Sequence, residues 1–249
     1  MSKVISIHSY RGGTGKSNTT ANLAVLLAGR GKRVAVIDTD IQSPGIHVLF
    51  QLDEQAMKFS LNDYLWGKCK IHQAAFDVSR HLGIGQPGAL FLVPSSLKAG
   101  EIARILREGY DVNLLNEGFQ RLVKELRLDY LMIDTHPGLN EETLLSIAIS
   151  DILVVLIRPD QQDYLGTGVT IEVARKLSVP NMQIIVNKVP ALFSPDEVKT
   201  RVENAYRTPV VAVLPHSDEL MALGSNGLFV LKFPTHPVTL SLQSVVDHL

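Results

Sequence analysis

The sequence has few of the features that mark whole classes of proteins. Its 249 residues include one cysteine, Cys69, which excludes a disulfide framework and fits a reducing compartment. Lys and Arg number 24 against 25 Asp and Glu, so overall charge indicates no polyanionic or membrane partner. No apolar run approaches the ~20 residues that cross a bilayer, and no signal-peptide pattern opens the chain. We therefore expect a soluble, cytoplasmic protein.

Hydrophobic residues make up 45% of the chain, which is enough to form a sizeable core and excludes general disorder. Short apolar segments alternate with longer segments of helical periodicity. The expected strands are residues 4–8, 34–38, 90–93, 130–134, 152–157, 183–187 and 210–214. The expected helices are residues 17–29, 99–108, 113–126, 141–149, 165–177, 196–206 and 238–249.

Most of these strands are apolar on both faces, as strands of a parallel sheet covered by helices must be. The alternation therefore predicts an α/β fold of the doubly wound type, a mostly parallel sheet flanked by helices. No internal repeat and no linker long enough to divide the chain is visible, and one such domain commonly has about 200 to 250 residues. We expect residues 1–249 to form a single domain.

A glycine-rich loop joins the first expected strand to the first expected helix. It reads Tyr10-Arg11-Gly12-Gly13-Thr14-Gly15-Lys16-Ser17. Its glycines allow left-handed backbone angles that turn N–H groups inward, and the helix N-terminus behind them favours an anion. Lys16 is placed to reach the β and γ phosphates of a nucleotide, and the Ser17 hydroxyl is placed to hold Mg²⁺.

Acidic residues end two of the expected strands. Asp38 and Asp40 follow the apolar run 34–37, and Asp134 follows the apolar run 131–133. Open α/β sheets gather ligands at the carboxyl ends of their strands, and carboxylates there can hold Mg²⁺ through its water shell. Aspartate also favours turns, so each acid alone would be weak evidence. Together with the loop upstream, the acids predict a Mg²⁺-dependent nucleotide site.

These motifs, in this order, resemble those of the MinD/ParA ATPases, which are P-loop NTPases of the SIMIBI type. Residues 10–17 fit that family's deviant loop, x-K-G-G-x-G-K-[ST], with Arg11 at the signature lysine and Tyr10 where an ordinary loop has its first glycine. The similarity extends from residue 3 to about residue 237. It implies ATP and Mg²⁺ as cofactors, slow hydrolysis stimulated by a partner protein, and an ATP-dependent homodimer. It also implies the positioning or partitioning of a cellular cargo.

The resemblance assigns roles to individual residues. The nucleotide would be bound by Arg11, Gly12, Gly13, Thr14, Gly15, Lys16, Ser17 and Asn18. Mg²⁺ would be held by Ser17, Asp38 and Asp134. The catalytic residues would be Lys16, Arg11 and Asp40, of which Asp40 would position the attacking water. Asn187 and Pro215 would lie against adenine, because an amide offers the base edge both a donor and an acceptor.

Three features allow two interpretations each. Arg11 either reaches across a dimer interface to the partner's phosphate, or is a surface arginine in a protein with altered dimerisation. His136 either packs at the dimer face or carries a proton. A set of basic residues at helical spacing either contacts DNA phosphates nonspecifically or forms a solvated helix face. The set consists of Arg104, Arg107, Arg121, Lys124 and Arg127.

Two rival classes share the expected fold. One is a metabolic ATP-dependent enzyme, such as a ligase, an amidotransferase or a tyrosine kinase. Against it, no glutaminase domain is visible, and the last tyrosine is Tyr206. The other delivers metal or electrons, and Cys69 alone is a poor ligand set for that task. No Lys or Arg follows Lys232, so autonomous membrane binding by a basic amphipathic tail is not expected.

Overall fold

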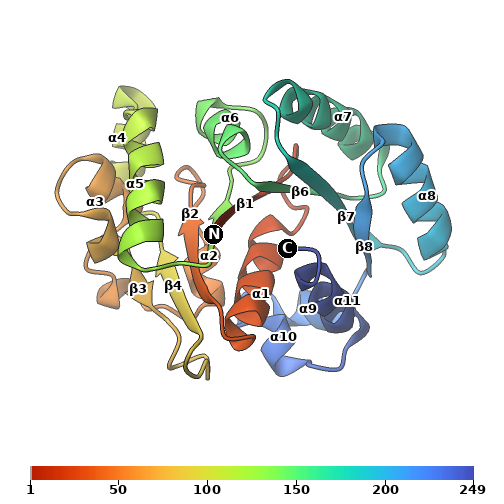
Figure 1. Cartoon of the computed structure of the whole chain (residues 1–249), viewed down its shortest axis with the longest axis horizontal. Coiled ribbons are helices and arrows are strands. Elements are labelled where there is room, and N and C mark those ends of the chain that lie inside the picture. The colour runs from red at the N-terminus through yellow and green to blue at the C-terminus, as the bar shows by residue number, and fades with distance from the viewer. Residues whose placement is uncertain (1) are drawn as a thin grey trace.

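One eight-stranded sheet runs through the molecule (Figure 1). The computed structural model describes residues 2–249. The strand order is β3-β4-β2-β5-β1-β6-β7-β8. The strands are β1 (Lys3–His8), β2 (Arg33–Asp38), β3 (Phe76–Asp77), β4 (Ala89–Val93), β5 (Tyr130–Asp134), β6 (Ile152–Ile157), β7 (Asn181–Val189) and β8 (Val210–Pro215). Neighbouring strands are parallel, except that β3 pairs antiparallel with β4.

Helices cover both faces of this sheet. The longer ones are α1 (Lys16–Gly29), α4 (Ala99–Glu108), α5 (Val112–Glu125), α6 (Glu141–Ala148), α7 (Gln161–Lys176), α8 (Pro195–Tyr206) and α11 (Pro237–Val246). The short ones are α2 (Ile46–Leu49), α3 (Leu61–Leu65), α9 (Asp218–Leu223), α10 (Phe229–Lys232) and the 3₁₀ helices Glu54–Ala56 and Ile71–Ala74. In the described chain, residues 2–249, no helix is long and apolar enough to cross a membrane.

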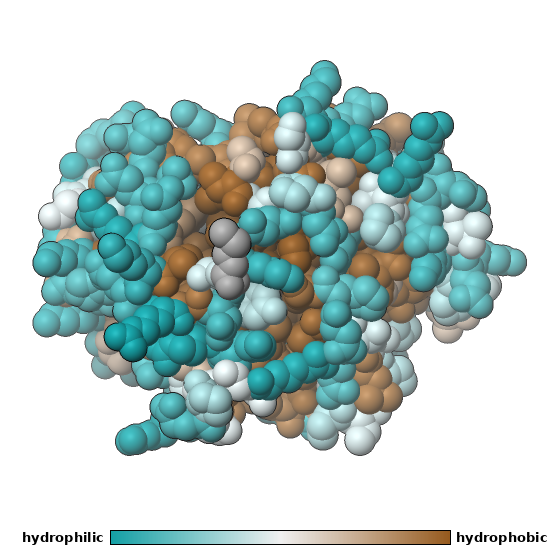
Figure 2. Space-filling model, viewed as in Figure 1, coloured by the Kyte–Doolittle hydropathy of each residue, from teal (hydrophilic) through white to brown (hydrophobic). Residues whose placement is uncertain are grey.

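Apolar side chains divide into two layers around the sheet. Helices α1, α10 and α11 lie over one face of the sheet (Figure 1), and their buried side chains belong to one apolar cluster with those of the strands. Helices α4 and α5 cover the part of the other face that β2 and β5 form, and α6, α7 and α8 cover the part that β6, β7 and β8 form. The doubly wound α/β fold predicted from the sequence is thus confirmed. On the face of the molecule that Figure 2 shows, hydrophilic residues cover the outer helices and hydrophobic residues are visible between them.

The seven expected strands and seven expected helices are all present. Strands β5 and β6 and helix α4 have the expected ends, and the ends of the other elements are shifted. Helix α7 begins at Gln161 instead of residue 165, because the Asp160 side chain caps it by accepting from Asp163 N. Strand β7 is longer than expected at both ends. Strand β3 was not expected, since two residues are too few to show an alternating pattern.

The parallel arrangement brings the carboxyl ends of the central strands to one edge of the sheet. Strands β2 and β5 are paired so that Asp38 lies opposite Asp134, and β1 lies on the far side of β5. The loop after β1 and the loops after β2 and β5 therefore meet at this edge. Such an edge is where open α/β sheets bind ligands.

A close contact between Gly88 and helix α1 fixes the position of that helix against β4. A Cβ added at Gly88 would lie 2.2 Å from the backbone oxygen of Ala28, which no side-chain movement can relieve. Gly85, in the same loop, has no atom within 4 Å of an added Cβ. The backbone approach at Gly88 therefore requires glycine for its lack of a side chain.

We expect Gly88→Ala to lower the free energy of unfolding by about 1–3 kcal/mol, because the backbone of α1 must move to admit the methyl group. The matched change Gly85→Ala should alter it by less than about 0.5 kcal/mol. Urea denaturation of both variants checks the expectation. Equal stability of the two variants would contradict the close packing of α1 on β4.

Candidate nucleotide-binding site

The loop between β1 and α1 is braced by its own side chains. Gly13 and Gly15 have φ angles of 76° and 98°, in the left-handed region that glycine tolerates best. Thr14 Oγ1 donates to Ser9 Oγ at 2.9 Å, and Ser9 Oγ donates to the Arg11 carbonyl at 2.7 Å. These bonds hold the loop in shape and leave the N-terminus of α1, at Lys16, behind it.

Two residues at the end of β7 brace the same loop from the other side. Asn187 Nδ2 donates to the Thr14 carbonyl at 2.8 Å, and Lys188 Nζ donates to the Gly13 carbonyl at 2.8 Å. A Cβ added at Gly15 would lie 2.5 Å from Asn187 Nδ2. Gly15 is therefore required both for its backbone angle and for the close approach of Asn187. From the sequence, Asn187 is expected near the base and Lys188 has no predicted role.

Three charged side chains lie buried below the loop. Lys16 is 7% exposed, and Asp38 and Asp134 are 1% exposed each. Burial raises the pKa of Asp38 well above its usual range, and the neighbouring Asp134 and Asp40 charges add to the rise. Burial likewise raises the pKa of Asp134, although hydrogen bonding from Ser17 and the charge of Lys16 oppose it. Burial lowers the pKa of Lys16, while the three acids oppose that change.

Hydrogen bonds fix the direction of both buried carboxylates. Thr20 Oγ1 donates to Asp134 Oδ1 at 3.1 Å, and Asp38 accepts from the backbone N–H groups of Asp40, at 3.0 Å, and Gly45, at 3.3 Å. None of the sequence motifs points to Thr20. Its position four residues after Lys16 places both on one side of α1, which is the signal that would have found it.

The donors in this cluster suit a hard divalent cation. Among residues 2–249, no group of three or more His, Cys, Asp or Glu side chains could hold a metal ion by itself. Ser17, Asp38 and Asp134 offer oxygen atoms only, and Mg²⁺ is typically held by one or two carboxylates together with phosphate and water. When ionised, Asp38 and Asp134 carry two negative charges against the one positive charge of Lys16, and a cation bound beside them would offset the difference. The residues present therefore fit Mg²⁺ shared with a bound phosphate.

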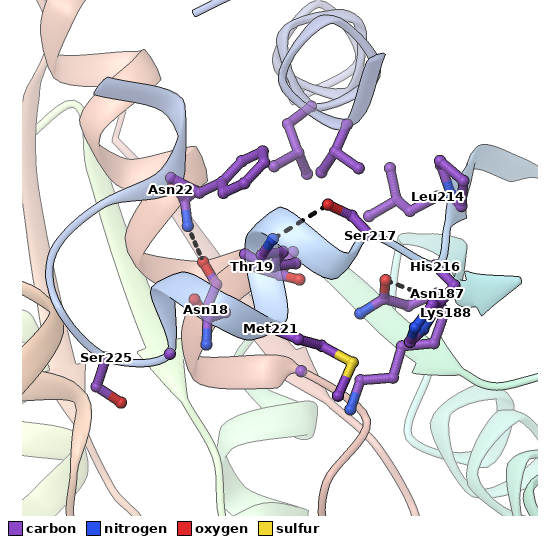
Figure 3. Close-up of a pocket in the computed structure, with 17 residues that line it drawn as sticks. Asn18, Thr19, Asn22, Asn187, Lys188, Leu214, His216, Ser217, Met221 and Ser225 are labelled. Carbon is purple, nitrogen blue, oxygen red and sulfur yellow. Dashed lines mark hydrogen bonds between the residues drawn. The ribbon is translucent and has the colours of Figure 1, made fainter. Parts of the chain in front are cut away.

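A cavity of about 260 Å³ opens beside the loop (Figure 3). Its lining includes Asn18, Asn187 and Pro215, which the sequence analysis assigned to the nucleotide. Leu214 and Met221 are among the apolar residues of its wall (Figure 3). An apolar wall with a few polar groups is typical of small-molecule sites. The Asn187 amide already donates to Thr14, and its oxygen accepts from Lys188 N at 2.8 Å.

Two histidines lie near the charged cluster. His8, fully buried at the end of β1, has its Nδ1 2.8 Å from Thr135 Oγ1. Burial lowers the pKa of His8 to about 3, and the nearby Lys16 charge contributes, so this ring is neutral near pH 7. His136 lies 2.6 Å, through its Nδ1, from Asp40 Oδ1. The structure thus brings His136 to one of the expected catalytic residues.

Arg11 lies on the surface against two acids of the same chain. Its Nη1 is 3.6 Å from Asp160 Oδ1 and 3.6 Å from Asp163 Oδ1, and its side chain is 40% exposed. Asp163 is also paired with Arg158, through an Nε–Oδ2 distance of 2.9 Å. These two acids, which helix α7 and its N-cap supply, are not predictable as partners of Arg11 from the sequence. Action of Arg11 on a partner's phosphate stays a prediction.

The remaining residues singled out from the sequence lie away from this site. Arg104 and Arg121 are each paired with a glutamate one helical turn away, at 2.8 Å and 3.3 Å, as on a solvated helix face. Contact with DNA stays a prediction. Burial raises the pKa of Cys69 to about 11, and the charge of Asp63 adds to the rise. A thiol that holds its proton so firmly is a poor metal ligand.

Loop, acids and cavity together define a P-loop nucleotide-binding protein, and similarity to known proteins agrees. A family model described as "AAA domain" matches residues 2–184. The chain is 28% identical over its whole length to an uncharacterized ATP-binding protein of Methanocaldococcus jannaschii, of which it covers 88%. Its fold is similar to that of Pyrococcus horikoshii MinD complexed with Mg-ADP, with a TM-score of 0.81 and 22% identity, covering 100% of this chain and 96% of the other. A ParA family ATPase from Chlorobium tepidum gives 0.79 and 18%, with 100% of both chains covered.

The chain therefore belongs to the MinD/ParA family of P-loop ATPases. The resemblance read from the sequence is confirmed at this level. The roles of single residues, including the replacement of the signature lysine by Arg11, stay predictions.

Because Asn187 braces the loop, we expect Asn187→Ala to weaken binding of both ATP and tripolyphosphate about two- to tenfold, the effect of one lost hydrogen bond. The exposed Asn181, at the start of the same strand, supplies the control Asn181→Ala, which should change neither. Titration calorimetry measures all four affinities. A loss confined to ATP would show that Asn187 acts on the base and does not brace the loop.

Proposed function

We propose that the protein is an ATP-dependent switch, which binds Mg·ATP, hydrolyses it slowly and forms a homodimer in its ATP state. The observation that carries the proposal is the buried cluster of Lys16, Asp38 and Asp134 directly beneath the phosphate loop. Two carboxylates and one ammonium group suit a phosphate that brings its own divalent cation. Membership of the MinD/ParA family supports the same assignment.

Each part of the site has a task in this proposal. The backbone of residues 12–15 and the Lys16 ammonium would hold the phosphates, and Asn18, Asn187 and Pro215 line the cavity that would take the base. Ser17, Asp38 and Asp134 would hold Mg²⁺, which when bound neutralises charge on the terminal phosphates. Asp40, whose side chain is 18% exposed, would orient the attacking water.

Dimerisation would use Arg11. Its guanidinium is partly exposed beside the phosphate loop and is held by acids at a distance longer than a hydrogen bond, so it can be released. A planar guanidinium matches phosphate oxygens better than an ammonium group does. In this proposal, a partner protein stimulates hydrolysis, and the cycle positions or partitions a cellular cargo.

We expect Lys16→Ala to weaken ATP binding roughly 100-fold, because it removes a charge-assisted hydrogen bond and leaves buried acids without their cation. The control Lys32→Ala removes an exposed lysine beyond the far end of α1 and should leave the affinity unchanged. Calorimetry with Mg·ATP measures both variants. An unchanged affinity for Mg·ATP in Lys16→Ala would show that this loop does not bind the ATP phosphates.

If Arg11 pairs with a partner's phosphate, ATP should shift the protein from monomer to dimer and ADP should not, because the γ phosphate adds the charge. We expect Arg11→Ala to reduce the dimer fraction and Arg11→Lys to retain most of it. Light scattering in the slowly hydrolysing Asp40→Ala background measures the populations, with Arg30→Ala as the control for an exposed, ion-paired arginine. Equal dimer fractions in all variants would make Arg11 an ordinary surface residue.

A further inference from the structure

A histidine and an aspartate join the two loops that follow the paired strands β2 and β5. Asp40 lies two residues beyond the end of β2, and His136 lies two residues beyond the end of β5. Because Asp38 and Asp134 are opposite each other in the sheet, Asp40 and His136 stand at equivalent places in their loops. His136 Nδ1 and Asp40 Oδ1 are 2.6 Å apart, and their side chains are 23% and 18% exposed.

The hydrogen bond has a defined direction. A carboxylate oxygen accepts, so the tautomer of His136 that fits this contact carries its proton on Nδ1 and donates to Asp40. The same Asp40 oxygen accepts from Ser43 N at 3.1 Å, and Asp40 N donates to Asp38 Oδ1 at 3.0 Å. The backbone of the loop after β2 is thus bonded to the buried Asp38. His136 connects the Asp40 carboxylate to the loop after β5.

The loop that carries His136 is itself fastened to the phosphate loop. Thr135 Oγ1 donates to the Ile7 carbonyl at 2.9 Å, and Gly138 N donates to the Ser9 carbonyl at 3.2 Å. Ile7 belongs to β1, and Ser9 begins the loop that leads to Lys16. His136 therefore stands on backbone that is held on both sides to the phosphate-binding element.

We propose that His136 is a positioning residue for hydrolysis, which holds the Asp40 carboxylate in a fixed place relative to the phosphate loop. The inference rests on the proposed function, in which Asp40 orients the attacking water. Without His136, the Asp40 carboxylate would keep only the bond from Ser43 N, which lies in the same loop and does not fix it relative to the phosphate loop. A displacement of about 1 Å in such a group can cost 10²-fold in rate. His136 acts through Asp40 and takes no part in the cradle that binds ATP.

This role predicts a split between kcat and KM. His136→Ala should lower kcat for ATP roughly 10- to 100-fold and change KM less than about twofold, because the phosphate loop and the base cavity stay intact. His136→Asn places an amide N–H near the position of the lost Nδ1–H and should restore kcat to within about threefold of the wild type. His72→Ala removes a surface histidine that is also paired with an acid, Glu125, and should leave both constants unchanged.

A double substitution shows whether His136 acts through Asp40. Asp40→Ala should lower kcat by about 10²-fold or more, and adding His136→Ala to it should lower kcat no further. Single-turnover hydrolysis of ATP and melting curves of every variant complete the experiment. The Asn variant keeps the test decisive if His136→Ala fails to fold, since loss of kcat in a folded His136→Asn protein would contradict the proposal.

The outcomes separate the two levels of the account. A wild type that binds no ATP or does not hydrolyse it overturns the proposed function. If the wild type hydrolyses ATP and His136→Ala has the same kcat, only the role of His136 is overturned. The same holds if His136→Ala lowers kcat by the same factor in the wild-type and in the Asp40→Ala protein.

Discussion

The burial of two aspartates beside one lysine constrains everything around the site. Asp38 and Asp134 stand opposite each other on paired strands, below the loop that carries Lys16. Burying charge without a full complement of opposite charge costs several kcal/mol, and the raised pKa values of both acids reflect that cost. A bare phosphate would add to this excess of negative charge, whereas a phosphate that brings a divalent cation would place that cation beside the two carboxylates. This charge distribution supports the proposal that the ligand is a metal–nucleotide complex and not a bare anion.

Hydrogen bonds connect this buried cluster to the two loops that follow β2 and β5. Thr39 binds the Asp134 carbonyl through both its backbone N–H and its hydroxyl, so the loops after β2 and β5 start from a common point. Asp40 and His136 join the same loops again further out. A change in charge at Asp38 and Asp134 is therefore expected to affect the positions of both loops together. Such a pair of coupled loops is the kind of element that a nucleotide can switch between two arrangements.

The sequence predicted the parts of this site that depend on local pattern. The strands show as apolar runs, and the phosphate loop is recognisable because glycine and lysine are needed at fixed spacing. Pairing between distant residues was not predictable in the same way. That Asp38 faces Asp134 follows from β2 lying next to β5, and the bonds from His136 to Asp40 and from Arg11 to Asp160 depend on side-chain rotamers. Strand β3 was not predicted, because two residues are too few to show the alternation of apolar and polar side chains that marks a strand.

Thermal unfolding of the wild-type protein with Mg²⁺, with ATP, and with both tests most directly whether the buried cluster is a site for Mg·ATP. The account predicts that the complex at about 100 times its Kd stabilises the fold by roughly 2.7 kcal/mol, which for about 250 residues raises Tm by roughly 5–10 °C. Mg²⁺ alone or ATP alone should raise Tm less. The same Tm in buffer and in saturating Mg·ATP would contradict the account.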